Sequence, residues 1–214
     1  MNKIRSGVRR IGDAAKVLLG TAFAVDKRKG QNAKNKNQSD YWCPVCLSQV
    51  DKFLPLSDYY HQNLDKYGYI HSPYLSETIN RLAYRCPICG ATDRARLYAL
   101  YLNQYQTDAA NFLDIAPDVQ LTKFIKNLPW ITEYRSADLE MERADDIINI
   151  TDMAAYSDAS FDFFLCSHVL EHVEEDERAM AELYRILKPG GRGIAMVPIN
   201  LGLSEDYEDP TKVT

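Results

Sequence analysis

The sequence is poor in three features that would each suggest a familiar class of protein. It has no apolar run long enough to cross a bilayer, and so offers no candidate membrane-spanning helix. It has only five cysteines, and four of them stand in two Cys-Pro-X-Cys pairs, which favours reduced or metal-bound thiols in a cytoplasmic setting over a disulfide scaffold. Basic residues are scarce beyond residue 38: residues 39–214 contain 15 Lys and Arg and 28 Asp and Glu, which gives a net charge of −13. This acidic body argues against a nucleic-acid partner held through its phosphates.

The N-terminus has the opposite charge. Residues 1–38 carry ten Lys and Arg against two Asp and Glu, a net charge of +8. Between Ile4 and Ala22, apolar residues recur at spacings of three and four, which predicts a basic amphipathic helix, and residues 27–40 are polar and read as a linker. We favour a loose tail or a helix packed on its own protein over a contact of residues 4–22 with a membrane surface or a protein. A signal peptide is less favoured still, because the apolar segment is short.

The four paired cysteines are spaced like metal ligands. They are Cys43, Cys46, Cys86 and Cys89. Each pair can form a tight turn that aims two thiolates at one ion, and two such turns give a tetrahedral sulfur site. Structural zinc is the preferred occupant, with iron, a redox pair or buried free thiols as alternatives. The 39 residues between the pairs predict an inserted subdomain whose tyrosines (59, 60, 67, 69 and 74) belong to a core and not to a base-stacking surface.

A helix is expected over residues 92–105, after the second cysteine pair. Leu97, Leu100, Tyr101 and Tyr105 would share the face that covers a sheet, and Arg94 and Arg96 would lie on the solvated or interdomain side.

Strands and helices then alternate. Residues 111–118 are expected to form a strand and the loop after it, and Asp118 would cap a helix that runs to residue 127. Residues 131–138 and 146–150 read as the next two strands. The aromatic run 161–166 suits a strand buried on both faces.

The segment 161–198 has the clearest organisation. An apolar stripe at 179/180, 183/184 and 187 predicts a helix over residues 176–187, and Lys188-Pro189-Gly190-Gly191 would end it in a turn. Residues 192–197 would form a further strand, which completes a right-handed βαβ unit.

This stretch resembles class I S-adenosylmethionine-dependent methyltransferases, in their small-molecule and lipid-methylating branch. Three segments carry the resemblance: Ser-Phe-Asp at 160–162, Cys-Ser-His-Val-Leu-Glu-His-Val at 166–173, and Ala-Met-Ala-Glu-Leu-Tyr-Arg-Ile-Leu-Lys-Pro-Gly-Gly at 179–191. The implied fold is α/β: a Rossmann-like parallel sheet in the order 3-2-1-4-5, with helices on both faces, the family's last hairpin absent, and a small N-terminal zinc-binding module. We therefore expect a basic helix and linker at 1–40, a zinc-knuckle module at 41–92 and an incomplete methyltransferase domain at 93–214.

The resemblance also implies a cofactor, S-adenosylmethionine, and a set of residues that contact it. These are Asp114, Ala116, Asp138, Asn149, Ile150, Ser167 and His168. Asp138 falls 24 residues after Asp114, a spacing that suits a carboxylate on the ribose hydroxyls. His168 is the candidate catalytic residue, because an imidazole titrates near neutral pH and could take a proton from the acceptor. His168, Glu171 and His172 also match an inverted zinc-protease motif, but a histidine at a strand end cannot share a helix face with the second.

The loop after the first strand departs from the family pattern. Where relatives have glycines after the acidic residue, this chain has Ile115-Ala116-Pro117. The preferred function is methyl transfer to a small-molecule, sugar or lipid-linked glycan acceptor. A catalytically inactive scaffold of the same fold and an RNA methyltransferase remain alternatives.

Overall fold

The computed structural model describes residues 41–59, 62, 66, 75–76, 79–105, 107 and 109–205. The chain divides after Gln38 into two units, and the second, which begins at Ser39, contains all the described residues. The amphipathic helix expected at residues 4–22 and its linker lie outside the described residues. Among the helices that are described, none has the length and apolar character needed to cross a membrane.

Five parallel strands form the central sheet, in the order β5-β4-β3-β6-β7. This is the Rossmann-like order 3-2-1-4-5 expected from the sequence, and the prediction is confirmed. The strands are β3 (Ala110–Ile115), β4 (Ile131–Asp138), β5 (Asp146–Ile147), β6 (Phe161–Ser167) and β7 (Leu187–Met196).

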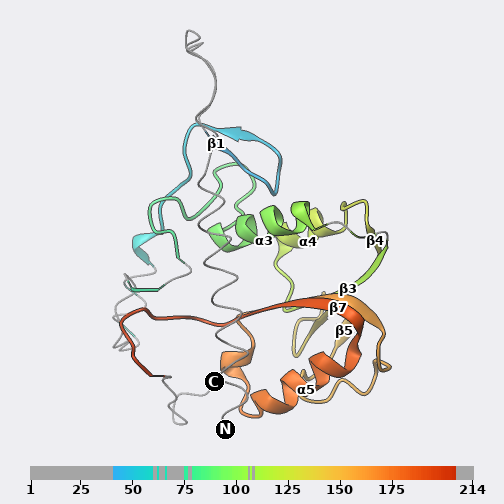
Figure 1. Cartoon of the computed structure of the whole chain (residues 1–214). Coiled ribbons are helices and arrows are strands. Elements are labelled where there is room, and N and C mark those ends of the chain that lie inside the picture. The colour runs from blue at the N-terminus through green and yellow to red at the C-terminus, as the bar shows by residue number, and fades with distance from the viewer. Residues whose placement is uncertain are drawn as a thin grey trace. The chain divides into compact units, whose positions relative to one another are not determined.

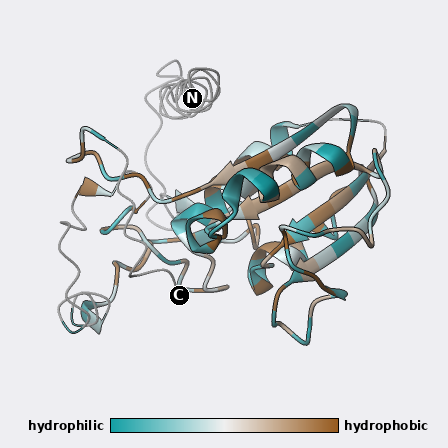
Figure 2. Ribbon diagram, turned by 90° about the horizontal axis from the view of Figure 1, so that it is seen from below, coloured by the Kyte–Doolittle hydropathy of each residue, from teal (hydrophilic) through white to brown (hydrophobic). Residues whose placement is uncertain are grey.

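Helices cover both faces of this sheet. Figure 1 shows α3 (Asp93–Gln104) and α4 (Val119–Ile125) on one side and α5 (Asp176–Ile186) on the other. Because side chains alternate along a strand, β3 sends Phe112 into the core under α3 and α4, and Leu113 and Ile115 into the core under α5. The strands are accordingly apolar along much of their length, whereas the helices present hydrophilic sides (Figure 2).

Aromatic rings fill the core beneath α3. The rings of Phe112 and Phe163 stack with centroids 5.1 Å apart, which joins the two central strands. Tyr105, from the end of α3, meets Phe163 and Trp130 edge-on, with centroids 5.2 Å apart in both pairs. Such ring contacts add to the apolar area that is buried, so this cluster anchors α3 to the sheet.

Two predicted strands have different bounds in the structure. The strand predicted at 146–150 has only two residues, because Ala137 and Asp138 are the last residues of β4 that can pair with it. The strand predicted at 192–197 begins earlier, at Leu187, and includes the Lys-Pro-Gly-Gly segment predicted as a turn. Leu187 pairs with Phe161 and Arg192 with Phe163, so the residues between them form an irregularity within the strand.

The buried face of α3 differs from the prediction. Its buried residues are Ala95, Arg96, Tyr98, Ala99 and Leu102. Leu100 is exposed instead, and Leu97, Tyr101 and Tyr105 are only partly buried.

The burial of Arg96 has a specific cause. Its guanidinium donates hydrogen bonds to the carbonyls of Ala83, Tyr84 and Ala91 and lies 3.9 Å from the centroid of the Phe53 ring. These carbonyls compensate the loss of water around the charge. Arg96 therefore ties the first turn of α3 to the segments around the cysteines.

The cysteine-containing segment packs against the same core as the sheet. Its short hairpin consists of β1 (Tyr41–Trp42) and β2 (Gln49–Val50). Cys43, Val50 and Cys86 are buried in one cluster with Phe112 and Phe163. Tyr59, expected in a core, is 68% exposed, and the other four tyrosines named with it lie outside the described residues.

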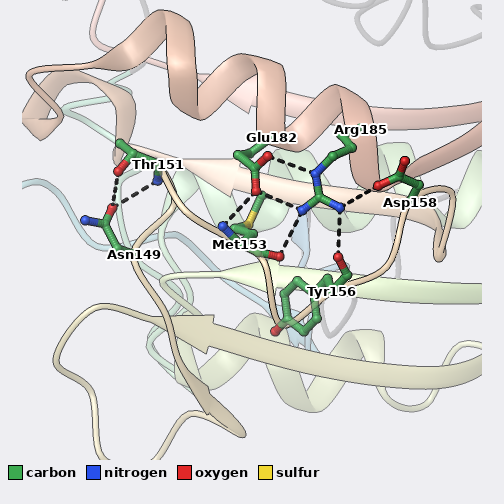
Figure 3. Close-up of polar contacts among 7 residues, drawn as sticks. All are labelled: Asn149, Thr151, Met153, Tyr156, Asp158, Glu182 and Arg185. Atoms are coloured by element: carbon green, nitrogen blue, oxygen red, sulfur yellow. Dashed lines mark hydrogen bonds and ion pairs between the residues drawn. The ribbon is translucent and has the colours of Figure 1, made fainter.

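One arginine joins α5 to the loop after β5. Arg185 donates to the carbonyls of Met153 and Tyr156 and forms ion pairs of 2.8 Å with Glu182 and Asp158 (Figure 3). Glu182 also accepts the backbone N–H of Met153 at 2.7 Å. The loop that carries Asn149 is thus held to the helix by the planar, multiply donating guanidinium, whose fork of N–H groups a lysine could not reproduce.

We expect Arg185→Met to lower the free energy of unfolding by about 2–3 kcal/mol, because two carbonyls lose a charged donor and Glu182 loses its partner. Methionine preserves helix propensity and most of the aliphatic stem. Arg178→Met is the matched control, since its ion pair with Glu175 joins side chains that are 56% and 62% exposed. That change should cost less than about 0.5 kcal/mol. Urea denaturation measures both, and equal effects would contradict the proposed role of Arg185.

Candidate functional site

The carboxyl ends of the strands lie at one edge of the sheet. Ile115 at the end of β3 pairs with Ala137 of β4 on one side and with Cys166 of β6 on the other. Ser167 pairs in turn with Met196, the last residue of β7. The point between β3 and β6 is where the chain order reverses, and ligands of open α/β sheets bind outside such a point. The register therefore brings the segments after β3, β4 and β6 together.

The segment after β3 turns through a left-handed residue without a glycine. Ala116 has φ +55°, and its N–H donates to the carbonyl of Ala137 at 2.9 Å. Its side chain is exposed, Pro117 is buried, and Asp118 caps α4 by accepting from the N–H groups of Gln120 and Leu121. The backbone thus adopts at Ala116 a conformation for which glycine is the usual choice, at a strain of about 1 kcal/mol.

The carboxylate of Asp114 is buried and hydrogen-bonded within the protein. Its side chain is 1% exposed, Tyr134 of β4 donates to the carboxylate at 2.7 Å, and the hydroxyl of Thr122 in α4 lies 3.5 Å away. Burial raises the pKa of Asp114 to about 7, and the two hydroxyls lower it in part. Its hydrogen bonds go to the protein interior, and its contact with a cofactor stays a prediction.

Asp138 and Asn149 each shape a turn beyond a strand end. One oxygen of Asp138 accepts from the N–H groups of Glu140 and Met141, both at 2.9 Å. The side-chain oxygen of Asn149 accepts from both the N–H and the hydroxyl of Thr151, also at 2.9 Å (Figure 3). These bonds fix the two side chains in defined orientations. Ile150, predicted beside Asn149, is buried in the core under α5.

The end of β6 carries the most unusual geometry. His168 follows the strand with φ +57°, and its N–H donates to the carbonyl of Met196 at 2.8 Å. A histidine in this conformation is strained and persists only where its surroundings fix it. Ser167, just before it, shares a 2.7 Å hydrogen bond with the hydroxyl of Tyr98 from α3.

His168 forms a pair with a carboxylate that the sequence interpretation did not assign to the site. Nδ1 of His168 lies 2.9 Å from an oxygen of Glu171, which belongs to η2 (Leu170–His172) beside it. Nε2 of His168 and the second oxygen of Glu171 are buried and have no hydrogen-bond partner among the described residues. Buried polar atoms are nearly always paired, so these two are suited to a ligand or water. The spacing of three residues between His168 and Glu171 indicates this contact only when the segment is known to form a 3-10 turn.

The four paired cysteines converge in space. Their sulfur atoms all lie within 4.8 Å of one another, with Cys43 to Cys89 at 3.8 Å and Cys46 to Cys86 at 3.9 Å. The edge of a tetrahedron of zinc-bound sulfurs is about 3.8 Å for a bond of about 2.3 Å. The cluster is thus suited to one tetrahedral ion.

The two cysteine turns are built alike. Leu47 and Gly90, the residues after each pair, are left-handed and donate to the carbonyl of the first cysteine of their turn, at 2.9 and 3.0 Å. The N–H groups of Cys43 and Cys86 donate in the same way to residues five positions ahead. Cys166 lies apart from this cluster, and burial raises the pKa of its thiol to about 12, as expected for an apolar strand residue.

The buried carboxyl of Asp114 predicts a pH dependence of stability. Its folded pKa of about 7 exceeds the unfolded value, so the folded state holds the proton more tightly. The protonated carboxyl adds at most about 4 kcal/mol to the free energy of unfolding. This contribution is fully present below pH ~4 and is lost as the pH rises to ~7. Urea unfolding from pH 4 to 8 should show this slope in the wild type and lack it in Asp114→Asn. Equal slopes in the two proteins would refute the assignment.

Comparison with known proteins finds the methyltransferase family model "Methyltransferase domain", which matches residues 132–195. No curated protein matches the chain. Among solved structures, YcgJ from Bacillus subtilis is 20% identical, with 44% of this chain and 47% of that chain covered and a TM-score of 0.38. PH0226 from Pyrococcus horikoshii is 18% identical, with 66% and 65% covered and a TM-score of 0.40. A candidate methyltransferase from Bacillus halodurans is 22% identical, with 44% and 42% covered and a TM-score of 0.35. The chain spans less than half the length of the Bacillus proteins.

Proposed function

We propose that the chain binds S-adenosylmethionine and transfers its methyl group to a small-molecule, sugar or lipid-linked glycan acceptor in the cytoplasm. The match of residues 132–195 to the methyltransferase family supports the general activity. The geometric observation that carries the proposal is the meeting of two left-handed residues, Ala116 and His168, at the switch point of a parallel sheet. The acidic body supports an acceptor other than nucleic acid.

The exposed backbone at Ala116 would approach the donor closely, since its side chain adds a single methyl group. Asp138 would accept hydrogen bonds from the ribose hydroxyls through its second oxygen, because the first is engaged by backbone N–H groups. Asn149 and Ile150 would contact the adenine, and the backbone at Ser167 and His168 would line the remaining side. The donor supplies the methyl group and the leaving sulfide of an in-line displacement.

His168 is the proposed proton acceptor for the nucleophile. The carboxylate of Glu171 would accept a hydrogen bond from Nδ1–H, which leaves Nε2 as the nitrogen with the free lone pair. A base oriented by a carboxylate is the arrangement that general-base catalysis requires, and the unpartnered Nε2 has the free lone pair. Glu171 is thus the orienting residue, and His168 would touch the acceptor.

Binding of S-adenosylhomocysteine tests the donor site without knowledge of the acceptor. The wild type should bind it in isothermal titration calorimetry. Asp138→Asn should weaken binding by about tenfold or more, because the amide keeps the turn-capping oxygen but loses a charged acceptor worth ~1.5 kcal/mol or more. Glu142→Gln removes one charge from the same exposed loop and should leave the dissociation constant within about twofold.

If the wild type shows no heat at millimolar ligand, the inactive-scaffold alternative replaces the proposed activity. If Asp138→Asn and Glu142→Gln behave alike, the chain still binds the donor but Asp138 has no part in it.

We also propose that Cys43, Cys46, Cys86 and Cys89 hold one structural zinc ion. The sulfur distances and the two equivalent turns support a tetrahedral site with four protein ligands. Such a site leaves no position for a substrate, so its contribution would be to stability.

The purified protein should contain about one zinc per chain by plasma mass spectrometry, with iron as the competing outcome. Cys86→Ser should lose the metal and lower the unfolding temperature. Cys166→Ala is the control because it removes a thiol outside the cluster, and it should keep the metal. A protein free of both metals after anaerobic purification would overturn the proposal.

A further inference from the structure

Helix α3 connects the cysteine cluster to the strand ends. Its N-cap, Thr92, comes three residues after Cys89, and the side chain of Thr92 accepts the N–H of Ala95 at 3.2 Å. Ala91, just before the cap, accepts the N–H of Cys86 at 2.9 Å. The helix therefore starts directly from the second cysteine turn, with no linker that could absorb a movement.

Two side chains of α3 face opposite ways. Arg96 and Tyr98 are two residues apart, which places them about 200° apart around the helix axis. Arg96 reaches the carbonyls of Ala83, Tyr84 and Ala91 in the cysteine-containing segment. Tyr98 instead reaches the sheet, where its hydroxyl lies 2.7 Å from Oγ of Ser167 and 2.9 Å from Sδ of Met196.

The two residues that Tyr98 contacts are those that hold His168. Ser167 precedes His168 in the chain, and the carbonyl of Met196 accepts the His168 N–H at 2.8 Å. Tyr98 is 5% exposed, and burial raises its pKa to about 12, so it remains a neutral hydroxyl that can both donate and accept. A single buried hydroxyl thus joins the ends of β6 and β7 at the strained residue.

We propose that Tyr98 is a positioning residue that couples the four-cysteine site to the donor site, so that loss of the metal weakens donor binding. The inference rests on the proposed function. When the cysteine turns loosen, Arg96 loses its carbonyl partners, α3 is free to shift, and Tyr98 moves away from Ser167 and Met196. The backbone at His168 then loses the support that keeps it left-handed. By linkage, bound donor must tighten metal binding by the same factor.

The first measurement compares wild type, Tyr98→Phe and Tyr101→Phe, each with metal and after chelation. Tyr101→Phe is the control, because it removes a hydroxyl from the same helix while keeping a partly buried ring against Phe163. Chelation should weaken S-adenosylhomocysteine binding about three- to tenfold in the wild type and in Tyr101→Phe, the range expected of such couplings. In Tyr98→Phe, binding should already be weaker with metal present, and chelation should change it less than about twofold.

The second measurement needs no ligand. Methyl-labelled methionine gives a resonance for Met196, whose sulfur contacts Tyr98 directly. Chelation should shift that resonance in the wild type and not in Tyr98→Phe. If Met196 responds but no variant binds S-adenosylhomocysteine, the proposed function fails and the coupling stands. If removal of the metal does not shift the Met196 resonance, the coupling is refuted, whether or not S-adenosylhomocysteine binds.

A third comparison applies if chelation unfolds the chain or if no metal is found. Arg96→Lys breaks the fork of carbonyl contacts while the cysteines remain. On the wild-type background, Arg96→Lys should shift the Met196 resonance. Added to Tyr98→Phe, the same substitution should have no further effect. Additive shifts in the double variant would show that Arg96 and Tyr98 act independently and would overturn the inference.

Discussion

The pairing of β3 with β6 is the constraint on which the other features of the sheet depend. It joins segments 51 residues apart, from Phe112 opposite Phe163 to Ile115 opposite Cys166. Two packed cores hold this pairing, one on each face, since Phe112 and Phe163 stack on one side while Leu113 and Cys166 are buried on the other. Because the chain leaves β3 in one direction and β6 in the other, this pairing creates the switch point itself.

Each face then supports a different part of the candidate site. On the face of α3, Tyr98 holds the ends of β6 and β7 through Ser167 and Met196. On the face of α5, Arg185 and Glu182 hold the loop after β5 through the backbone of Met153 and Tyr156. The strand ends are therefore fixed from both sides of the sheet, which is the preorganisation that a binding site for a flexible cofactor requires.

The sequence predicted the sheet because its signals are local. An aromatic run marks β6, the Asp118 cap marks the start of α4, and the cysteine spacing indicated the four-sulfur cluster, whose sulfurs lie together in the structure. The sheet order followed from the resemblance of residues 160–191.

The sequence was least informative where contacts between distant residues determine the structure. Arg96 was assigned to the solvated or interdomain side of α3, and it does contact the cysteine-containing segment. A sequence does not reveal that three backbone carbonyls will surround its guanidinium and bury it. Glu171 was named only in the protease motif that was set aside, since its pairing with His168 depends on a 3-10 turn and a left-handed residue. Asp114 has the expected position in the chain, but its orientation is set by Tyr134 of the neighbouring strand.

Ala116 and His168 show how the chain leaves the sheet on either side of the switch point. Each is the first residue after a central strand, each is left-handed, and each donates its N–H to a carbonyl at the end of the outer neighbouring strand. Glycine would relieve the strain of about 1 kcal/mol at either position. A non-glycine residue in such a place needs support from its surroundings. Ala116 is followed by the buried Pro117 and the capped start of α4. At His168, the proposed support is the pair of contacts that Tyr98 makes with Ser167 and Met196. Ala116 is exposed and adds a single methyl group to its loop, whereas His168 adds an imidazole after the neighbouring strand. In the proposed methyl-transfer site, Ala116 would allow close backbone approach to the donor and His168 would accept the proton.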